Sequence, residues 1–424
     1  MIKYIGQRFL LFALSIVLLS TGFKTFANEP VISVIGKYLC IDYKPFFPIG
    51  LYAFPDNRSD DAIWKEAADA GFNFVLSDQS GKHGIYVSRR IPWKNVDGRR
   101  VSLMELYRDE SMLGELKQFI AENEDDTTMI CWHAPDEPCW FGPSANSLQL
   151  GYEAIKANSN KPVWLNVGPS FTEVWHYSKP RDFFRTADIL SEDIYPIPDG
   201  KPKHGQGYNR YAYYVGEYTR KLVDLGSIDG VQSTPIWMVL QGFGWGDLTS
   251  FDNPSDFVPP TMHELRYMSY DAIVNGATGI LWWGVHRNTS IRYWEKLKAM
   301  ASELRDLTYL WTCPFELVPE KLDVTYQDPD TDDPLRWLIK VHDDDVYILA
   351  VNTRPVPLKN VTFNLVPGGK LTKVNDVFDE NRSMHVLGGN SWTDDFEGYG
   401  VQIYKTDIYF SFMRRYFDDP VSQN

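Results

Sequence analysis

Two adjacent carboxylates, Asp136 and Glu137, stand between Pro135 and Pro138. Like charges side by side repel, which raises the pKa of one of them, and the prolines stiffen the backbone that carries them. A carboxyl group that keeps its proton near neutral pH acts as a general acid. The motif therefore predicts a catalytic pair, with Glu137 as proton donor and Asp136 as the nearby anion. A solvent-exposed Asp-Glu pair in a surface loop is the alternative.

A third carboxylate, Asp193, ends another apolar run and is followed by Tyr195. Asp193 is a catalytic candidate because a carboxylate across a wider gap from the acid can activate a water molecule. Tyr195 could donate a hydrogen bond to a carboxylate or to a ligand. The alternative is that Asp193 anchors the proline-rich loop that follows it.

Aromatic and polar residues near the ends of other apolar runs are candidates for ligand binding. Aromatic residues make up 15% of the chain, including 14 Trp, and exposed aromatic rings often act as stacking platforms. Burial in a large core is the alternative for each ring, and a packed core position is the alternative for His133. The candidates are Tyr52, His133, Trp140, Tyr195, Gln241, Trp245 and Trp283.

The elements that must position these residues alternate short apolar runs with helical patterns. A capping box at Thr261 and Glu264 opens one such helix, and Ser59 is expected to cap another that stops at Gly71. The expected strands are 48–52, 72–76, 84–87, 128–132, 162–167, 187–193, 235–241 and 279–283. Their continuous apolar character is typical of strands buried on both faces. Eight such units predict an α/β fold, a (β/α)₈ TIM barrel, whose sites lie at the carboxyl ends of the strands.

The pattern changes after about residue 318, where short β-type runs are separated by turn signals. The expected strands there are 337–341, 346–351, 361–365 and 401–404. They predict a C-terminal antiparallel β-sandwich domain. The expected organisation is a signal peptide over 1–27, the barrel over 28–317 and the β-sandwich over 318–424.

The N-terminus has the pattern of an export signal. Lys3 and Arg8 precede the apolar run 9–19, and Thr25 and Ala27 place small residues before a cleavage site. We therefore expect a periplasmic or secreted protein. The net charge of −14 argues against nucleic-acid partners and against a membrane partner after signal removal. A polyanionic ligand would require a local basic cleft.

The four cysteines do not have the spacing of a zinc site. Cys131 and Cys139 flank the Asp-Glu motif and could form a disulfide or remain buried thiols; the other two are Cys40 and Cys313. We expect no metal and no cofactor. The oligomeric state does not follow from the sequence.

This layout resembles the glycoside hydrolases built on (β/α)₈ barrels, over nearly the whole mature chain. In their largest clan the acid/base is a Glu after strand four, in an Asn-Glu motif, and the nucleophile is a Glu after strand seven. The resemblance implies that Glu137 is the acid/base. The preceding Asn is replaced by Asp136, and the strand-seven position is Gln241, which cannot form a glycosyl ester.

The Asp-Glu pair also resembles that of barrel hexosaminidases, which use the 2-acetamido group of the substrate as nucleophile. That resemblance implies Glu137 as acid/base and Asp136 as the residue that orients the acetamido group, with Tyr195 and Trp283 completing the pocket. The expected function is an exported glycoside hydrolase acting on an oligo- or polysaccharide. The alternatives are a substrate-assisted N-acetylhexosaminidase and a non-catalytic carbohydrate-binding barrel.

Overall fold

The computed structural model describes residues 29–105, 110–141, 143–168, 180–201, 210–248, 254–287, 290–317, 322–326, 334–343, 345–365, 369–379 and 381–410. The predicted export signal lies outside these residues and stays a prediction. Within the described residues, no helix has the length and apolar character required to span a bilayer.

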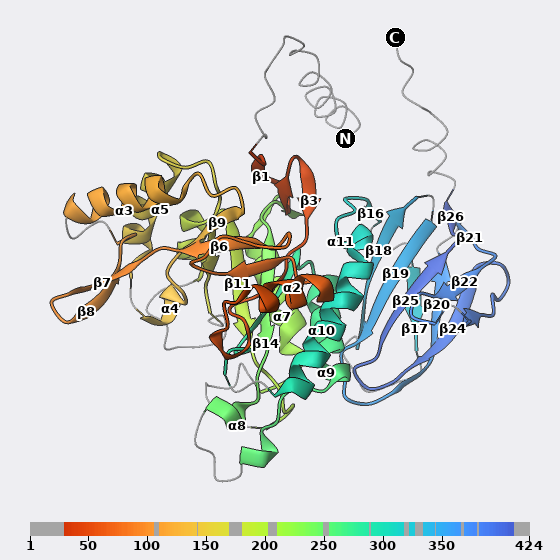
Figure 1. Cartoon of the computed structure of the whole chain (residues 1–424). Helices are drawn as coiled ribbons and strands as arrows, with labels where there is room; N and C mark the ends of the chain where they lie inside the picture. Colours follow the sequence, from red (N-terminus) through yellow and green to blue (C-terminus); the bar gives the residue numbers. More distant parts are fainter. Residues whose placement is uncertain are drawn as a thin grey trace, which may run out of the picture. The chain divides into compact units, whose positions relative to one another are not determined.

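Eight described strands close into a barrel in which every neighbouring pair is parallel and the strands follow chain order around the ring (Figure 1). The barrel strands are β4 (Ile49–Leu51), β5 (Phe74–Leu76), β6 (Tyr86–Arg90), β9 (Met129–His133), β10 (Val163–Asn166), β11 (Ile189–Ile194), β14 (Ile236–Gln241) and β15 (Gly279–Trp283). Each overlaps one of the predicted runs, and the predicted (β/α)₈ barrel is confirmed.

The third strand differs most from its prediction. β6 extends to Arg90, whereas the apolar pattern ended at 87. Arg89 donates hydrogen bonds to Asn123 (2.7 Å) and Asp126 (2.9 Å), while Arg90 takes the opposite face of the strand. A strand can thus extend beyond its apolar residues where its charged side chains have hydrogen-bond partners or face a polar site.

The helices surround the barrel and join its strands. Asp60, not Ser59, caps α2, because its carboxylate accepts a hydrogen bond from the amide of Ile63 (3.1 Å). The capping box of Thr261 and Glu264 is present at the start of α9. The helices are α2 (Asp61–Ala70), α3 (Glu110–Asn123), α4 (Pro138–Phe141), α5 (Ala145–Lys156), α6 (Pro180–Phe183), α7 (Tyr214–Leu225), α8 (Trp245–Leu248), α9 (Met262–Val274), α10 (Ile291–Asp306) and α11 (Thr308–Trp311), with short 3₁₀ turns η1 (Pro55–Asn57), η3 (Phe184–Thr186) and η4 (Pro254–Asp256).

Smaller antiparallel sheets accompany the barrel. The first is formed by β1–β3, and its Leu39 packs with residues of the barrel interior. A hairpin of β7 and β8 follows β6 directly and projects away from the barrel (Figure 1). These elements are β1 (Ile32–Ile35), β2 (Tyr38–Ile41), β3 (Lys44–Phe46), β7 (Trp93–Val96), β8 (Arg99–Ser102), β12 (Ser227–Ile228) and β13 (Val231–Gln232).

The C-terminal part is a β-sandwich of antiparallel sheets, as predicted. Phe363 of one sheet packs against Tyr404 of the other with ring centroids 5.4 Å apart. The larger sheet contains β16 (Glu316–Leu317), β18 (Leu335–His342), β19 (Asp345–Asn352), β25 (Val401–Thr406), β22 (Val374–Asp376) and β23 (Ser383–Met384); the smaller contains β17 (Leu322–Thr325), β20 (Leu358–Leu365) and β24 (Ser391–Phe396), and β21 (Gly369–Lys370) pairs with β26 (Tyr409–Phe410). Because β16 pairs with β18, the larger sheet begins two residues before the predicted boundary at 317/318, which stays a prediction.

The cysteines do not form disulfides. All four are buried, and the option of a bridge between Cys131 and Cys139 is not realised. Cys131 lies in the barrel interior, where burial raises the pKa of its thiol to about 12. The thiols act as small apolar side chains in the core.

Strand β19 connects the two parts, because its alternate residues face different cores. Val346, Ile348 and Ala350 belong to the core of the sandwich. Tyr347, Leu349 and Val351 belong to the core that also contains the barrel helices. Because successive side chains of a strand point to opposite faces, β19 packs against one core on each of its faces.

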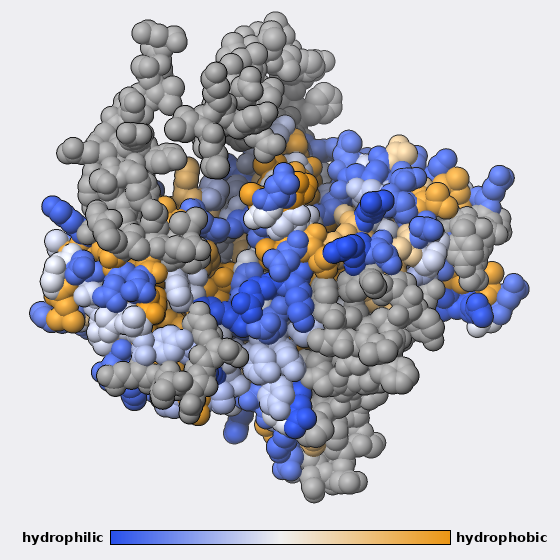
Figure 2. Space-filling model, turned by 180° about the vertical axis from the view of Figure 1, so that it is seen from behind, coloured by the Kyte–Doolittle hydropathy of each residue, from blue (hydrophilic) through white to orange (hydrophobic). Residues whose placement is uncertain are grey.

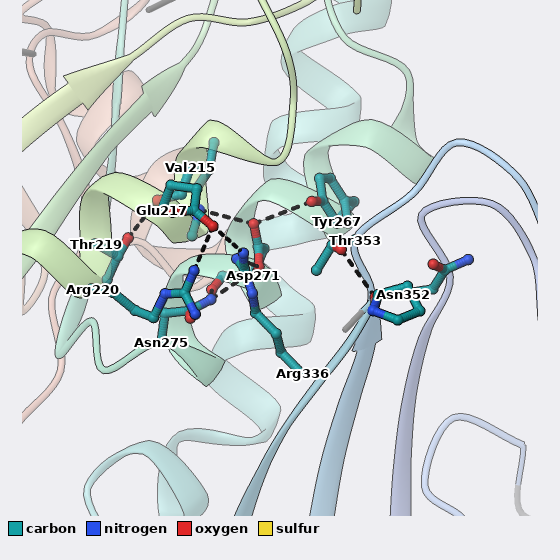
Figure 3. Close-up of polar contacts among 12 residues, drawn as sticks. Val215, Glu217, Thr219, Arg220, Tyr267, Asp271, Asn275, Arg336, Asn352 and Thr353 are labelled. Atoms are coloured by element: carbon teal, nitrogen blue, oxygen red, sulfur yellow. Dashed lines mark hydrogen bonds and ion pairs between the residues drawn. The ribbon is translucent and has the colours of Figure 1, made fainter. Parts of the chain in front are cut away.

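A buried ionic cluster reinforces this contact (Figure 3). Arg336 of β18 reaches Asp271 of α9 (3.1 Å) and Glu217 of α7 (2.7 Å). Asp271 is fully buried and also accepts hydrogen bonds from the amide of Gly216 (2.8 Å) and the hydroxyl of Tyr267 (3.2 Å). Each buried charge therefore has an opposite charge or a donor beside it, which offsets its loss of hydration.

On one face of the molecule, the described residues expose hydrophobic side chains in small groups (Figure 2). On the face drawn in Figure 2, these groups lie between hydrophilic residues among the coloured, described part of the chain. Such scattered exposure is ordinary for a globular protein and indicates no broad apolar docking surface on this face.

The cluster predicts that Asp271→Ala lowers the free energy of unfolding by about 3 kcal/mol, because it removes one of the two carboxylates that pair with the partly buried Arg336 and the acceptor of the Gly216 amide. Urea denaturation followed by fluorescence measures this. Asp306→Ala removes one carboxylate of an exposed pair with Arg305 and should change stability by less than about 1 kcal/mol. An equal effect of the two substitutions would contradict the assigned role.

Candidate active site

The candidate site lies at the carboxyl ends of the barrel strands, where inward-facing side chains form a ring. Ser191 and Asp193 share one face of β11 with Ile189, which packs with the residues of the barrel interior, so that this face points into the barrel. The Ser191 hydroxyl donates to Asn166 of β10 (3.0 Å). Alternation along the other strands extends the ring. Its members are Tyr52, Arg90, His133, Asn166, Asp193, Gln241 and Trp283.

Asp136 and Glu137 come from the loop that follows β9. The amide of Glu137 donates to the carbonyl of Asn166 (2.9 Å), and the amide of Ala134 donates to the carbonyl of Trp164 (2.8 Å). The loop thus continues alongside β10 before α4 begins. Glu137 has a left-handed backbone with φ of 48°. A non-glycine residue in this region is strained by about 1 to 3 kcal/mol, and such strain often occurs at functional sites.

Asn166 connects the two carboxylates that lie on either side of it. Its side-chain amide donates to Asp136 (3.1 Å) and to Asp193 (3.0 Å). The Asn166 oxygen accepts from Ser191, whose hydroxyl in turn accepts from the indole of Trp164 (2.8 Å). This chain fixes the orientation of the amide, so that its NH₂ group faces the carboxylates.

Glu137 and Asp193 form a hydrogen-bonded carboxyl pair, to which Tyr195 adds a further hydrogen bond on Asp193. Burial, followed by the charges of Asp193 and Asp136, raises the pKa of Glu137 well above its usual range. Burial also raises the pKa of Asp193, but hydrogen bonds from Asn166, Tyr195 and Glu137 oppose that shift. The shared proton therefore resides on Glu137, which donates to the Asp193 carboxylate.

Asp136 is the third member of this carboxyl cluster. Burial and the charge of Asp193 raise the pKa of Asp136 to about 6, against the opposing effects of the Asn166 hydrogen bond and the Arg90 charge. Three carboxyl groups so close together cannot all be ionised at low energy. At neutral pH the cluster can therefore hold a protonated acid beside two anions.

Aromatic rings form one wall of the site. Tyr195 stacks on Trp283 with centroids 5.4 Å apart, and Phe243 packs edge-on against both rings. Trp245 is buried, and its indole donates to the carbonyl of Tyr195 (2.9 Å). Trp245 therefore supports the wall, whereas Trp283 also lines the adjoining cavity.

Two residues predicted to bind a ligand, Gln241 and His133, are instead engaged within the protein. Gln241 is fully buried, and its amide accepts from the backbone of Ile197 (2.8 Å) and donates to the carbonyls of Ile197 (2.9 Å) and Phe243 (3.0 Å). These bonds hold the loop after β11. His133 is fully buried, and its ring packs edge-on against Tyr52 and Trp164. The side chain of Trp140 lies outside the described part of the structure.

A cavity of about 340 Å³ opens beside the carboxyl cluster. Its lining does not include the three carboxylates, but it shares Tyr52, Arg90 and Trp283 with the strand-end ring. The charge of Arg90 lowers the pKa of Asp136, and the charge of Asp136 raises the pKa of Tyr52. We therefore treat cavity and cluster as neighbouring parts of one site. The cavity is lined by Tyr52, Ala53, Asn57, Leu76, Ser77, Asp78, Arg90, Trp283, His286 and Arg287.

Asn166 and Arg90 were absent from the candidates drawn from the sequence. Both are the last residues of their strands, β10 and β6, as His133, Gln241 and Trp283 are of theirs. Strand alternation counted back from the strand end is the signal that identifies them. Among the described residues, no group of three or more His, Cys, Asp or Glu side chains is arranged to hold a metal ion.

No protein-family model matches the sequence, and no curated protein matches it. Solved structures match the fold. One described as a glycoside hydrolase has a TM-score of 0.56 and 12% identity, covering 91% of this chain and 97% of the other. A glycoside hydrolase family 5 protein from Bacteroides vulgatus has a TM-score of 0.55 and 13% identity, with 90% and 94% covered.

A GH42 β-galactosidase from G. stearothermophilus also matches, with a TM-score of 0.52 and 7% identity over 85% of this chain and 98% of the other. At such identities the likeness shows the shared fold, a barrel followed by further sheets, and the fold expected from the sequence resemblance is thereby confirmed.

The raised pKa of Asp136 predicts a specific pH dependence of stability. Because the native group binds its proton up to about pH 6 and the unfolded group only to about pH 4, its contribution to stability falls as pH rises from about 4 to about 6. In Asp136→Asn this loss is absent. The free energy of unfolding of the variant relative to wild type should therefore increase by on the order of 2 to 3 kcal/mol between these pH values.

Urea denaturation at several pH values measures this difference. Asp306→Asn, which removes an exposed carboxylate from α10, controls for the general effect of one lost charge. A constant difference between Asp136→Asn and wild type from pH 4 to pH 6 would show that Asp136 titrates normally.

Proposed function

We propose that this chain is an exported glycoside hydrolase that cleaves glycosidic bonds in an oligo- or polysaccharide, with Glu137 as the general acid. The observation that carries the proposal is the hydrogen-bonded pair of Glu137 and Asp193 at the carboxyl ends of the barrel strands. Partly buried beside an anion, Glu137 retains its proton at neutral pH and can donate it to a leaving oxygen.

The surroundings of the pair support a sugar ligand. Trp283 and Tyr195 present an aromatic wall, and rings of this kind stack on the apolar faces of sugars. Burial raises the pKa of both Tyr52 and Tyr195 well above the usual range, so that their hydroxyls remain hydrogen-bond donors. The structures that share this fold include proteins described as glycoside hydrolases.

The position of Asp193 bears on the mechanism. Retaining enzymes with a carboxylate nucleophile hold their two carboxyl groups about 5 to 5.5 Å apart, and inverting enzymes about 6.5 to 9.5 Å apart. The two carboxyls interact by a hydrogen bond, which favours a separation shorter than either of these. Asp193 is thus better suited to hold Glu137 and Asn166 than to attack the substrate from across the bond.

Glu137→Gln should reduce hydrolysis of 4-nitrophenyl glycosides by about 10³-fold, because the amide cannot donate the proton. The loss should be smaller for 2,4-dinitrophenyl glycosides, whose leaving group needs little protonation. The basic limb of the pH–rate profile, which reports the acid, should disappear in the variant. Steady-state kinetics over a panel of such glycosides measures all three effects.

Glu153→Gln on the exposed face of α5 is the matched control and should hydrolyse like wild type. Equal hydrolysis by wild type and Glu137→Gln would remove Glu137 from the acid role. Sugar binding by both proteins without turnover in either would instead identify a non-catalytic carbohydrate-binding barrel.

A substrate-assisted N-acetylhexosaminidase is the second candidate. It is favoured by the adjacent carboxylates Asp136 and Glu137. It is also favoured because Gln241, at the strand-seven position, cannot act as a nucleophile and bonds the backbone of a loop. In this mechanism the acetamido oxygen of the substrate attacks the anomeric carbon, Asp136 stabilises the developing charge on the acetamido nitrogen, and Glu137 protonates the leaving oxygen.

This second candidate predicts that a thiazoline analogue of the bicyclic intermediate inhibits hydrolysis competitively and binds at least about 10²-fold more tightly than the substrate. Asp136→Asn should weaken the thiazoline more than it weakens the substrate. Inhibition assays with N-acetylglucosaminide and glucoside substrates measure this. Hydrolysis of the glucoside at a rate equal to that of the N-acetylglucosaminide would exclude substrate assistance.

A further inference from the structure

The cavity beside the carboxyl cluster has a basic lining, although the chain carries a net charge of −14. Arg90 and Arg287 line it together with His286, and Asp78 is the acidic residue of the same lining. Two fixed positive charges against one carboxylate give the lining a net positive charge, whereas the adjoining carboxyl cluster is anionic.

The position of Arg90 at the end of β6, in the lining of the cavity, makes it a candidate for ligand binding. It ends β6, pairs in register with His133 of β9 and is exposed. Its guanidinium makes no hydrogen bond or ion pair with any other described residue, whereas that of its neighbour Arg89 bonds Asn123 and Asp126. A planar guanidinium with its donors free matches the two oxygens of a carboxylate or a sulfate.

Arg287 provides a second free group of donors. Its Nε donates to Nε2 of His286 (3.1 Å), and its terminal amino groups have no acceptor in the described part of the chain. Burial and the charges of Arg287 and Arg90 lower the pKa of His286, so that its ring is neutral at pH 7. The ring also packs edge-on against Trp283, which keeps the pair beside the aromatic wall.

The sequence around Arg90 is basic as well. Segment 89–100 contains five Arg or Lys residues and one Asp. It forms the end of β6 and the hairpin β7–β8, which projects from the barrel (Figure 1). Within the hairpin, the guanidinium of Arg100 lies 4.9 Å from the ring centre of Trp93. The basic character thus continues from the cavity along one projecting element.

We propose that this cavity binds an acidic sugar residue, with Arg90 and Arg287 contacting its carboxylate or sulfate ester. The inference rests on the proposed function, since it assigns the substrate class of the same site. Tyr52 and Trp283 would contact the ring of the sugar while the arginines contact its anionic group. The acidic residue would occupy a position next to the bond that Glu137 protonates.

Isothermal titration calorimetry on Glu137→Gln, which binds without cleaving, tests the proposal. The ligands are a uronic-acid disaccharide, a sulfated disaccharide and the neutral disaccharide of the same linkage. We expect at least one acidic ligand to bind about tenfold or more tightly than the neutral one, and its affinity to fall with added NaCl. The uronate and sulfate arms distinguish the two sources of the anion.

Arg90→Gln or Arg287→Gln in this background should remove about tenfold of the affinity for the acidic ligand and little of that for the neutral one. Arg90→Lys keeps the charge and should retain most of the preference, which separates recognition from misfolding. Arg185→Gln, an exposed arginine on η3 just before β11 at the opposite end of the barrel, is the matched control.

Equal affinity for acidic and neutral ligands, no binding of either acidic ligand, or no effect of the Arg90 and Arg287 substitutions overturns the inference. Hydrolysis assays on wild type keep the two proposals apart. Turnover of neutral glycosides alone would retain the hydrolase function and overturn the acidic substrate. Selective binding of acidic sugars without any turnover would retain the acidic ligand and overturn the hydrolase function.

Discussion

The site depends on one electrostatic constraint: three carboxyl groups share a space that cannot hold three full negative charges. Asp136 and Glu137 come from the loop after β9, and Asp193 from β11. Burial would protonate all of them, while the donors of Asn166 and Tyr195 stabilise charge on Asp193. The result is a division of roles in which Glu137 keeps its proton because the hydrogen bonds from Asn166 and Tyr195 stabilise the negative charge on Asp193.

The barrel makes this arrangement possible through its regular spacing. Adjacent strands lie about 4.8 Å apart, so that one amide on β10 can reach side chains from both neighbouring strands or their loops. Asn166 does this while Ser191 and Trp164 fix its orientation. A strained backbone at Glu137 requires a rigid support, which the closed sheet and the helices packed around it provide.

The sequence allowed the strands and the acidic residues to be predicted, because both leave local signals. Apolar runs mark strands buried on two faces, and an Asp-Glu pair between prolines is unusual at a strand end. The sequence indicates less clearly which way a side chain points and what it contacts. Gln241 occupies a strand-end position, yet its amide holds a loop, and this engagement depends on Ile197, which is distant in the sequence. Arg90 lies beyond the predicted strand 84–87, where alternation gives it no direction, and Asn166 lies within the predicted strand 162–167, where no local signal separates a polar site residue from a core position.

Net charge is a poor guide to the ligand of such a site, because screening limits its range. At physiological ionic strength the field of a charge decays over about 8 Å, so that acidic residues on distant surfaces contribute little inside the cavity. Arg90 acts at short range on both parts of the site, since its charge lowers the pKa of Asp136. An anionic group bound to Arg90 would weaken that effect and raise the pKa of Asp136. The charge of the ligand would then be coupled to the protonation of the carboxyl cluster, which makes Arg90 the residue through which recognition and proton transfer influence each other.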